Sequence, residues 1–195
     1  MRPAAAAERS EREQWWEYAR GAAARLLEGQ APPPVQVYGP VLNHGETAFF
    51  SATANYARLW GGDGSYTSTS LLALGSPGFM IGAFAVNGYF NHRRKAAARR
   101  DAQVRWREHQ RVGLVGTSHR LLVNTASQGW LTFAYGAVTE YYPDIQNCAL
   151  TVGFGDRGEP LLLSGPPVLA ASLLLSAAVA PDTWPHDPRL APLLD

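Results

Sequence analysis

The fold is decided by the stretch Val112-Gly-Leu-Val-Gly-Thr117-Ser-His-Arg120-Leu-Leu-Val123. Its two apolar runs are separated by a short polar step, which is the pattern of two strands joined by a tight turn. The Thr117 hydroxyl can hydrogen-bond the backbone of that turn, and Arg120 can lie along the sheet surface or pair with an acid. We therefore predict antiparallel pairing between Val112–Gly116 and Leu121–Asn124.

Short extended runs, punctuated by Gly, Asn, Asp and Pro, continue after this stretch. Such a density of turns is typical of an antiparallel sandwich or small barrel. One run matches GxGxxG at Gly153–Gly158, but no helix follows it, so we interpret it as a hairpin turn and not as a nucleotide loop. The predicted strands are Val112–Gly116, Arg120–Thr125, Gly129–Tyr135, Val138–Tyr142, Asn147–Phe154 and Pro160–Ser164.

The uncharged run from Pro166 to Ala180 predicts a helix. Pro suits the first turn of a helix, and a run of about fourteen residues is too short to span a bilayer. Because the run carries no charge, we expect the helix to be buried against the open end of the sheet. Its contact residues should be Leu169, Leu173 and Leu174.

At the other end of the chain, the sequence predicts a helix from about Glu8 to Glu28, rich in Ala, Leu, Glu and Arg. Gly29 and Pro32–Pro34 end this helix and form a stiff linker. We expect it to pack on the domain, and the alternative is a partner-binding helix. Apolar residues recur on one of its faces at Trp15, Tyr18, Ala22 and Leu26.

A first β-hairpin is predicted between these parts, with strands Glu46–Trp60 and Ser65–Leu74 joined by a turn at Gly61–Gly64. The chain then carries no charge over Leu71–Phe90 and becomes strongly basic over Asn91–Gln110, which we predict to be a helix. The uncharged run is open to three interpretations. It can be buried in the domain, inserted in a membrane, or a contact between copies of the chain.

The basic segment supplies the candidate binding residues. Cations beside an apolar run can hold phosphate or an anionic membrane surface, and each contributes about 1 kcal/mol near such a surface. The alternative is a solvated helix face without a ligand. The candidates for ligand or membrane binding are Arg93, Arg94, Lys95, Arg99, Arg100 and Arg107.

The decisive stretch is similar to the strand–turn–strand signature of GRAM-like and bacterial pleckstrin-homology domains, where an apolar strand ends in Thr and Arg-Leu opens the next. Residues 129–138 resemble the strand that follows in that family. The resemblance implies a mainly β (α+β) fold, a partly open barrel of about seven antiparallel strands with an apolar C-terminal helix. It implies structural motif roles for Thr117, Arg120, Trp130 and Tyr135.

With this resemblance, residues 1–34 form the N-terminal helix and Pro-rich linker, and residues 182–195 form a C-terminal tail. The domain itself covers residues 35–181, with the apolar–basic insertion at about 75–110 between the second and third strands. Phosphoinositide-binding members generally place Lys and Arg in the first hairpin, whereas here that loop is Gly61–Ser65. The resemblance therefore does not extend to inositol-phosphate binding at that loop.

Several functional classes are disfavoured by the composition. A net charge of +1 argues against a nucleic-acid binder driven by overall charge. Cys148 is the single cysteine, so no intrachain disulfide is available, and its alternation with apolar neighbours predicts a core position. The five histidines lack metal-ligand spacing. We predict no catalytic residue, metal or cofactor.

The sequence thus favours a non-catalytic binding or scaffolding module that acts at an anionic membrane surface or on a protein partner. The alternatives are a structural protein that self-associates as a homo-oligomer, and an enzyme without a recognisable motif. The first residues lack the apolar core of a signal peptide, so we expect a cytoplasmic protein, with peripheral membrane association if the basic segment binds lipid.

Overall fold

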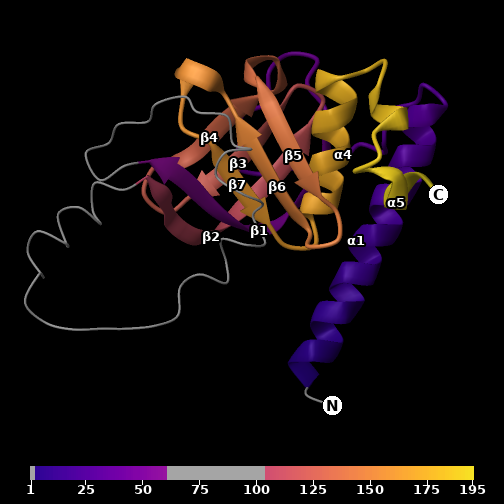
Figure 1. Ribbon diagram of the computed structural model, residues 1–195, viewed down its shortest axis with the longest axis horizontal. Helices are drawn as coiled ribbons and strands as arrows, with labels where there is room; N and C mark the ends of the chain where they lie inside the picture. Colours follow the sequence, from indigo (N-terminus) through magenta and orange to yellow (C-terminus); the bar gives the residue numbers. More distant parts are fainter. Residues whose placement is uncertain (1–2, 61–103) are drawn as a thin grey trace, which may run out of the picture.

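The structure, a computed structural model, describes residues 3–60 and 104–195. These residues form a seven-stranded antiparallel sheet with the order β4-β3-β2-β1-β7-β6-β5 (Figure 1). The fold is therefore mainly β with packed helices, as the sequence predicted. The strands are β1 (Ala48–Trp60), β2 (Arg105–Thr117), β3 (Arg120–Thr125), β4 (Gly129–Ala134), β5 (Glu140–Asp144), β6 (Ala149–Gly153) and β7 (Leu161–Ser164).

The predicted turn at the decisive stretch is confirmed. Strands β2 and β3 pair antiparallel from Gly113 opposite Asn124 to Gly116 opposite Leu121. Downstream, β4 to β7 fall within or close to the predicted runs. A short 3-10 helix, η3 (Gly155–Arg157), joins β6 to β7, so the GxGxxG match is a turn between two antiparallel strands. Local turn chemistry therefore specified this half of the sheet.

Strand β1 is the centre of the sheet and pairs with β2 along its whole length, from Ala48 opposite Thr117 to Trp60 opposite Arg105. Its other edge pairs with β7 at residues 55–58. The register shifts beside Glu108, which has a positive φ of 56°, and such a β-bulge bends the strand pair.

The prediction of a helix up to Gln110 was wrong for its last part, because residues 105–110 are extended in β2. Pairing with β1 overrides their local helix propensity. Within the described sheet, the apolar–basic segment lies between β1 and β2. The predicted strand Ser65–Leu74 and the helix up to residue 103 lie outside the described residues.

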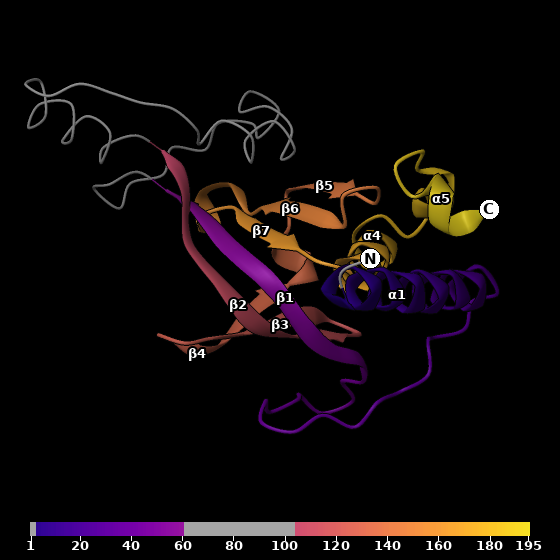
Figure 2. The same ribbon diagram turned by 90° about the horizontal axis from the view of Figure 1, so that it is seen from below.

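The C-terminal helix α4 (Val168–Val179) confirms its prediction, since Leu169 and Leu173 are fully buried and Leu174 nearly so. One face of α4 contacts a core between the two halves of the sheet, which contains Leu114, Phe133, Leu150 and Leu163 among others. Figure 2 shows β5–β7 and β3–β4 on two sides of β1, with α4 at the side of the sheet.

Helix α1 (Pro3–Leu27) confirms the N-terminal helix, although it begins earlier than predicted, and Gly29 ends it with a φ of +73°. The small side chains Ala19, Ala22 and Ala23 let α1 approach Leu169 and Leu173 of α4 closely. The Tyr18 hydroxyl donates a hydrogen bond to the Phe49 carbonyl at 2.7 Å. The predicted apolar face therefore packs on the domain.

The last residues, assigned only as a tail from sequence, also pack on α1 and α4. They form the 3-10 helix η4 (Trp184–His186) and the short helix α5 (Ala191–Leu194). Trp184, Leu190 and Leu193 are buried in the cluster that contains the inner face of α1. This second core fixes one side of α1 and leaves its other side facing solvent (Figures 1 and 2).

Candidate functional site

The basic residues proposed from sequence fall in two places. Arg93, Arg94, Lys95, Arg99 and Arg100 lie outside the described residues. Arg107 lies in β2, where its Nε donates a hydrogen bond to the Trp60 carbonyl at 3.1 Å. Arg107 therefore stands at the point where β1 and β2 leave the described sheet.

The motif residues Thr117 and Arg120 lie together in a buried polar network around Glu46. The Glu46 side chain is fully buried, and the Arg120 guanidinium binds it with Nε to Oε1 and Nη2 to Oε2, both at 2.8 Å. The Thr117 hydroxyl donates to Oε1 at 2.6 Å and accepts the backbone N–H groups of the β2–β3 turn. The expectation that Thr117 hydrogen-bonds the turn backbone is confirmed, and of the two alternatives for Arg120 the structure shows the pair with an acid.

Electrostatics keep this network ionised. Burial alone would raise the pKa of Glu46, but hydrogen bonds from Arg120, the Asn43 N–H and Thr117 outweigh it and lower the pKa to about 2. Nearby, Tyr135 donates its hydroxyl to the Thr117 carbonyl at 3.1 Å, and burial, followed by the charge of Glu46, raises its phenol pKa. The carboxylate of Glu46 and the hydroxyl groups of Thr117 and Tyr135 all have partners within the fold, so the role of the network is structural.

Trp130 serves a different structural purpose. It is partly buried against the small cluster of Ala48, Val115 and Leu122, on the face of the sheet away from the main core. Its indole also lies against Gly39, where a Cβ would come within 3.3 Å of Nε1. Gly39 has a φ of +103°, so this position favours glycine both by conformation and by space. Trp130 thereby packs the segment before β1, at Gly39, against the sheet.

A second arginine, Arg58 of β1, lies in a hollow of about 310 Å³ near the end of β1. Its Nη2 donates to Glu159 at Oε2 (2.8 Å) and at the carbonyl (2.6 Å), and its guanidinium lies 5.2 Å from the centre of the Phe133 ring. The charge of Arg58 is thus balanced by Glu159. The hollow is also lined by Glu108, so its two carboxylates outnumber its one cation and it does not favour an anionic ligand.

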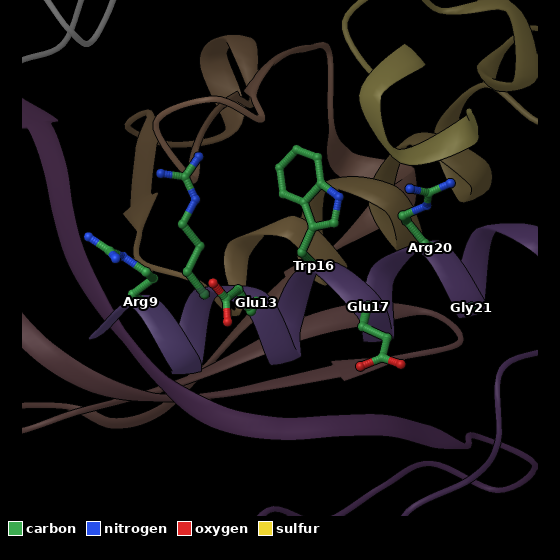
Figure 3. A pocket seen from close by; sticks show the side chains of 7 residues that line it. Arg9, Glu13, Trp16, Glu17, Arg20 and Gly21 are labelled. Carbon is green, nitrogen blue, oxygen red and sulfur yellow. The ribbon is translucent and has the colours of Figure 1, made fainter. Parts of the chain in front are cut away.

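A groove runs along the outer side of α1, and we call it the α1 groove (Figure 3). It encloses about 680 Å³. Arg12 and Arg20 are each held by one carbonyl outside the helix: Arg12 Nη2 donates to the Gln146 oxygen at 2.7 Å, and Arg20 Nη2 donates to the Asp195 oxygen. The half-buried indole of Trp16 lies between them. The lining residues are Arg9, Arg12, Glu13, Trp16, Glu17, Arg20 and Gly21.

The α1 groove was missed in the sequence analysis, which considered only the apolar face of this helix. A signal was present, because Arg12, Trp16 and Arg20 follow one another at intervals of four residues and so lie on one side of a helix. Trp15 and Trp16 are adjacent, however, and the sequence alone does not say which of the two faces solvent. In the structure Trp15 packs against Phe50, with ring centres 5.7 Å apart, and Trp16 lines the groove.

No group of three or more His, Cys, Asp or Glu side chains within residues 3–60 and 104–195 is arranged to hold a metal ion. Cys148 is buried as predicted, and burial raises the pKa of its thiol, which disfavours the nucleophilic thiolate. In the same part of the chain, no helix combines the length and apolar character needed to cross a membrane.

The described residues define an α+β protein whose antiparallel sheet contains a buried ion-pair network around Glu46 and whose helix α1 carries a groove with three arginines. No protein-family model matches the chain, and no curated protein matches its sequence.

Proposed function

We propose that the chain is a non-catalytic binding module with a pleckstrin-homology-like domain. The strand order supports this proposal, because a run of antiparallel neighbours, β1 to β4, meets a second run, β5 to β7, at β1. The apolar helix α4 follows the last strand and packs against the core between the two runs. This order agrees with the partly open barrel and C-terminal helix that the sequence resemblance implies.

The function we propose is attachment to an anionic membrane surface through the segment that joins β1 to β2. The observation that carries the proposal is the pairing of Trp60 with Arg105. It makes the connecting segment leave and re-enter the sheet at one point, on the side away from α1 (Figures 1 and 2). That segment contains the uncharged run Leu71–Phe90 followed by five cations, Arg93, Arg94, Lys95, Arg99 and Arg100.

The two parts of the segment supply the two contributions that peripheral membrane binding needs. Apolar surface that leaves water contributes about 25 cal/mol per Å², and each cation near an anionic surface adds about 1 kcal/mol. Arg105 and Arg107 extend the positive charge onto the described end of β2. A catalytic role has no comparable support among the described residues.

The test is co-sedimentation with vesicles of phosphatidylcholine, with and without phosphatidylserine. Changing Arg93, Arg94, Arg99 and Arg100 to Gln should weaken binding to the anionic vesicles by about three orders of magnitude at low salt, since four cations contribute about 4 kcal/mol. Added salt should weaken binding of the parent protein in the same direction.

A matched control removes the same charge elsewhere, by changing the exposed residues Arg9, Arg12, Arg20 and Arg157 to Gln. It should retain most of the vesicle binding. The proposal fails if the parent protein ignores anionic vesicles at low salt, or if both quadruple variants lose binding equally. Self-association of the parent protein in the absence of vesicles would favour the structural alternative.

A further inference from the structure

The α1 groove has the properties of a second binding surface, independent of the proposed membrane contact. Arg12 and Arg20 are each held in place by one carbonyl of a neighbouring segment, the turn after β5 and the end of α5. A guanidinium has several N–H donors in one plane, so each arginine keeps donors free for a further acceptor. Because the side chains are already ordered, a ligand loses less conformational freedom when it binds them.

The charges of the groove are arranged asymmetrically. Figure 3 shows Trp16 and Arg20 on the same side of α1, whereas the Glu17 carboxylate points to the opposite side. Arg9, at the N-terminal end of the groove, forms no ion pair or hydrogen bond within the part of the chain that the structure describes. The groove therefore combines a partly exposed indole with three guanidinium groups and two carboxylates, Glu13 and Glu17, of which Glu17 is turned away, so its net charge is positive.

The spacing along the helix selects the shape of the ligand. A helix rises 1.5 Å per residue, so Arg12, Trp16 and Arg20 follow one another at steps of about 6 Å. In an extended peptide, side chains on one face recur every second residue, at steps of about 6.6–6.8 Å. Residues i, i+2 and i+4 of an extended peptide can thus face Arg12, Trp16 and Arg20 in turn.

We infer that the α1 groove binds an extended acidic peptide of a partner protein, with carboxylates at positions i and i+4 and an apolar side chain at position i+2. The carboxylates pair with Arg12 and Arg20, where charge-assisted hydrogen bonds are strongest. The apolar side chain covers the Trp16 indole, which provides a large and rigid contact area. The chain would then act as an adaptor, with one contact at α1 and another at the far end of β1 and β2.

The charges argue against a segment of this chain as the occupant. The stretch between β1 and β2 contains five cations (Arg93, Arg94, Lys95, Arg99 and Arg100) and only two acids, Asp63 and Asp101. Like charges would meet if its basic part entered the groove. The pattern of an acid, an apolar residue and a second acid at alternate positions is the chemistry that the groove complements.

The test is fluorescence anisotropy at low salt with two labelled peptides of equal composition. One contains Glu-Ser-Leu-Ser-Glu, and the other contains the same residues as Glu-Glu-Ser-Ser-Leu. The first should bind the full chain at least about tenfold more tightly, because only it places both carboxylates and the leucine on one face. Equal affinities for the two peptides would overturn the proposal.

Variants separate the groove from the rest of the surface. Trp16→Ala and the double change Arg12→Gln with Arg20→Gln should each lower the affinity for the first peptide about tenfold or more. Glu17→Gln is the matched control on the same helix, and it should change affinity by less than about twofold. Circular dichroism of each variant checks that α1 remains folded.

Two results would contradict this assignment. If Trp16→Ala folds and binds the peptide like the parent, the groove is not the binding site. If the parent forms a concentration-dependent dimer in analytical ultracentrifugation that Trp16→Ala abolishes, the occupant is a second copy of the chain. Since neither assay contains vesicles, failure here leaves the membrane proposal standing, and failure of vesicle binding leaves this one standing.

Discussion

Two arginine sites of this molecule use the same chemical group in opposite ways. Arg120 forms a bidentate ion pair with the fully buried Glu46, and its remaining donors reach Thr132 and the Val41 carbonyl. Arg12, on the surface of α1, has one carbonyl partner and faces an open groove. In the first site the guanidinium donates its hydrogen bonds to groups within the protein. In the second, one hydrogen bond orders the guanidinium and its other donors stay available to a ligand.

The comparison shows how a cation can be assigned to structure or to binding. The deciding observation is where its carboxylate partner lies. Glu46 is enclosed with Arg120 between the linker and the β2–β3 turn, so separating the pair would expose a buried charge. In the groove, Glu17 lies on the far side of the helix (Figure 3), and no buried charge depends on Arg20.

The largest effect is expected from removing the support of the groove without touching its lining. Leu173 is fully buried against Ala19, Ala22 and Ala23 of α1. Leu173→Asp places an unpaired charge in this contact and should lower the free energy of unfolding by about 4 kcal/mol or more. Urea denaturation measures this change, and a variant as stable as the parent would show that α1 does not form part of the core.

Breaking the buried pair should rank next. Glu46→Ala leaves the Arg120 guanidinium in a largely buried position without its carboxylate, and we expect a loss of about 3–5 kcal/mol in the free energy of unfolding. The control is Asp187→Ala, which removes the carboxylate partner of the much more exposed Arg189 and should cost about 1 kcal/mol or less. Equal losses would mean that burial does not separate the two ion pairs.

Acid should reproduce part of this loss. The folded-state pKa of Glu46 is lowered to about 2 from 4.5, so its contribution is fully present above about pH 5 and is lost as the pH falls toward 2. The shift corresponds to about 3 kcal/mol. Urea unfolding at pH 5.5 and pH 2.5 should show a larger drop for the parent than for Glu46→Gln. Parallel drops would place the acid sensitivity elsewhere.

The smallest effect on stability is expected in the groove. The double change Arg12→Gln with Arg20→Gln removes two exposed hydrogen bonds and should lower the free energy of unfolding by less than about 1 kcal/mol. The same variant should lose most of its peptide affinity. A loss of stability comparable to that of Glu46→Ala would instead mean that the groove arginines are structural. It would contradict the distinction between a structural arginine site and a binding site.

The parts of the fold that the sequence predicted are those governed by neighbouring residues. Thr117 and Arg120 lie three residues apart, and their turn, the strands β2 and β3 and the uncharged helix α4 follow from local patterns. For Arg120 the sequence left two alternatives, a place along the sheet surface or a pair with an acid, and its partner Glu46 is 74 residues away. Only the assembled sheet identifies which acid that is.

The errors come from long-range pairing. Residues 105–110 contain good helix formers, and nothing local indicates that they extend β2 to meet β1. Glu108, with its positive φ, lies at the bulge where the register of the two long strands shifts, and a glutamate carries no signal for this conformation. The groove was missed for a similar reason, because it depends on the turn at Gln146 and on α5, which come late in the chain.

The pairing of Trp60 with Arg105 has a consequence for evolution. Because these residues are held opposite each other by the strand pair below them, the sheet requires only that the two ends meet. Doubling the length of a flexible loop costs only about 0.6 kcal/mol in closure entropy. As far as chain closure is concerned, a longer connection between β1 and β2 costs the sheet little, so relatives that share the sheet can differ in length at this position.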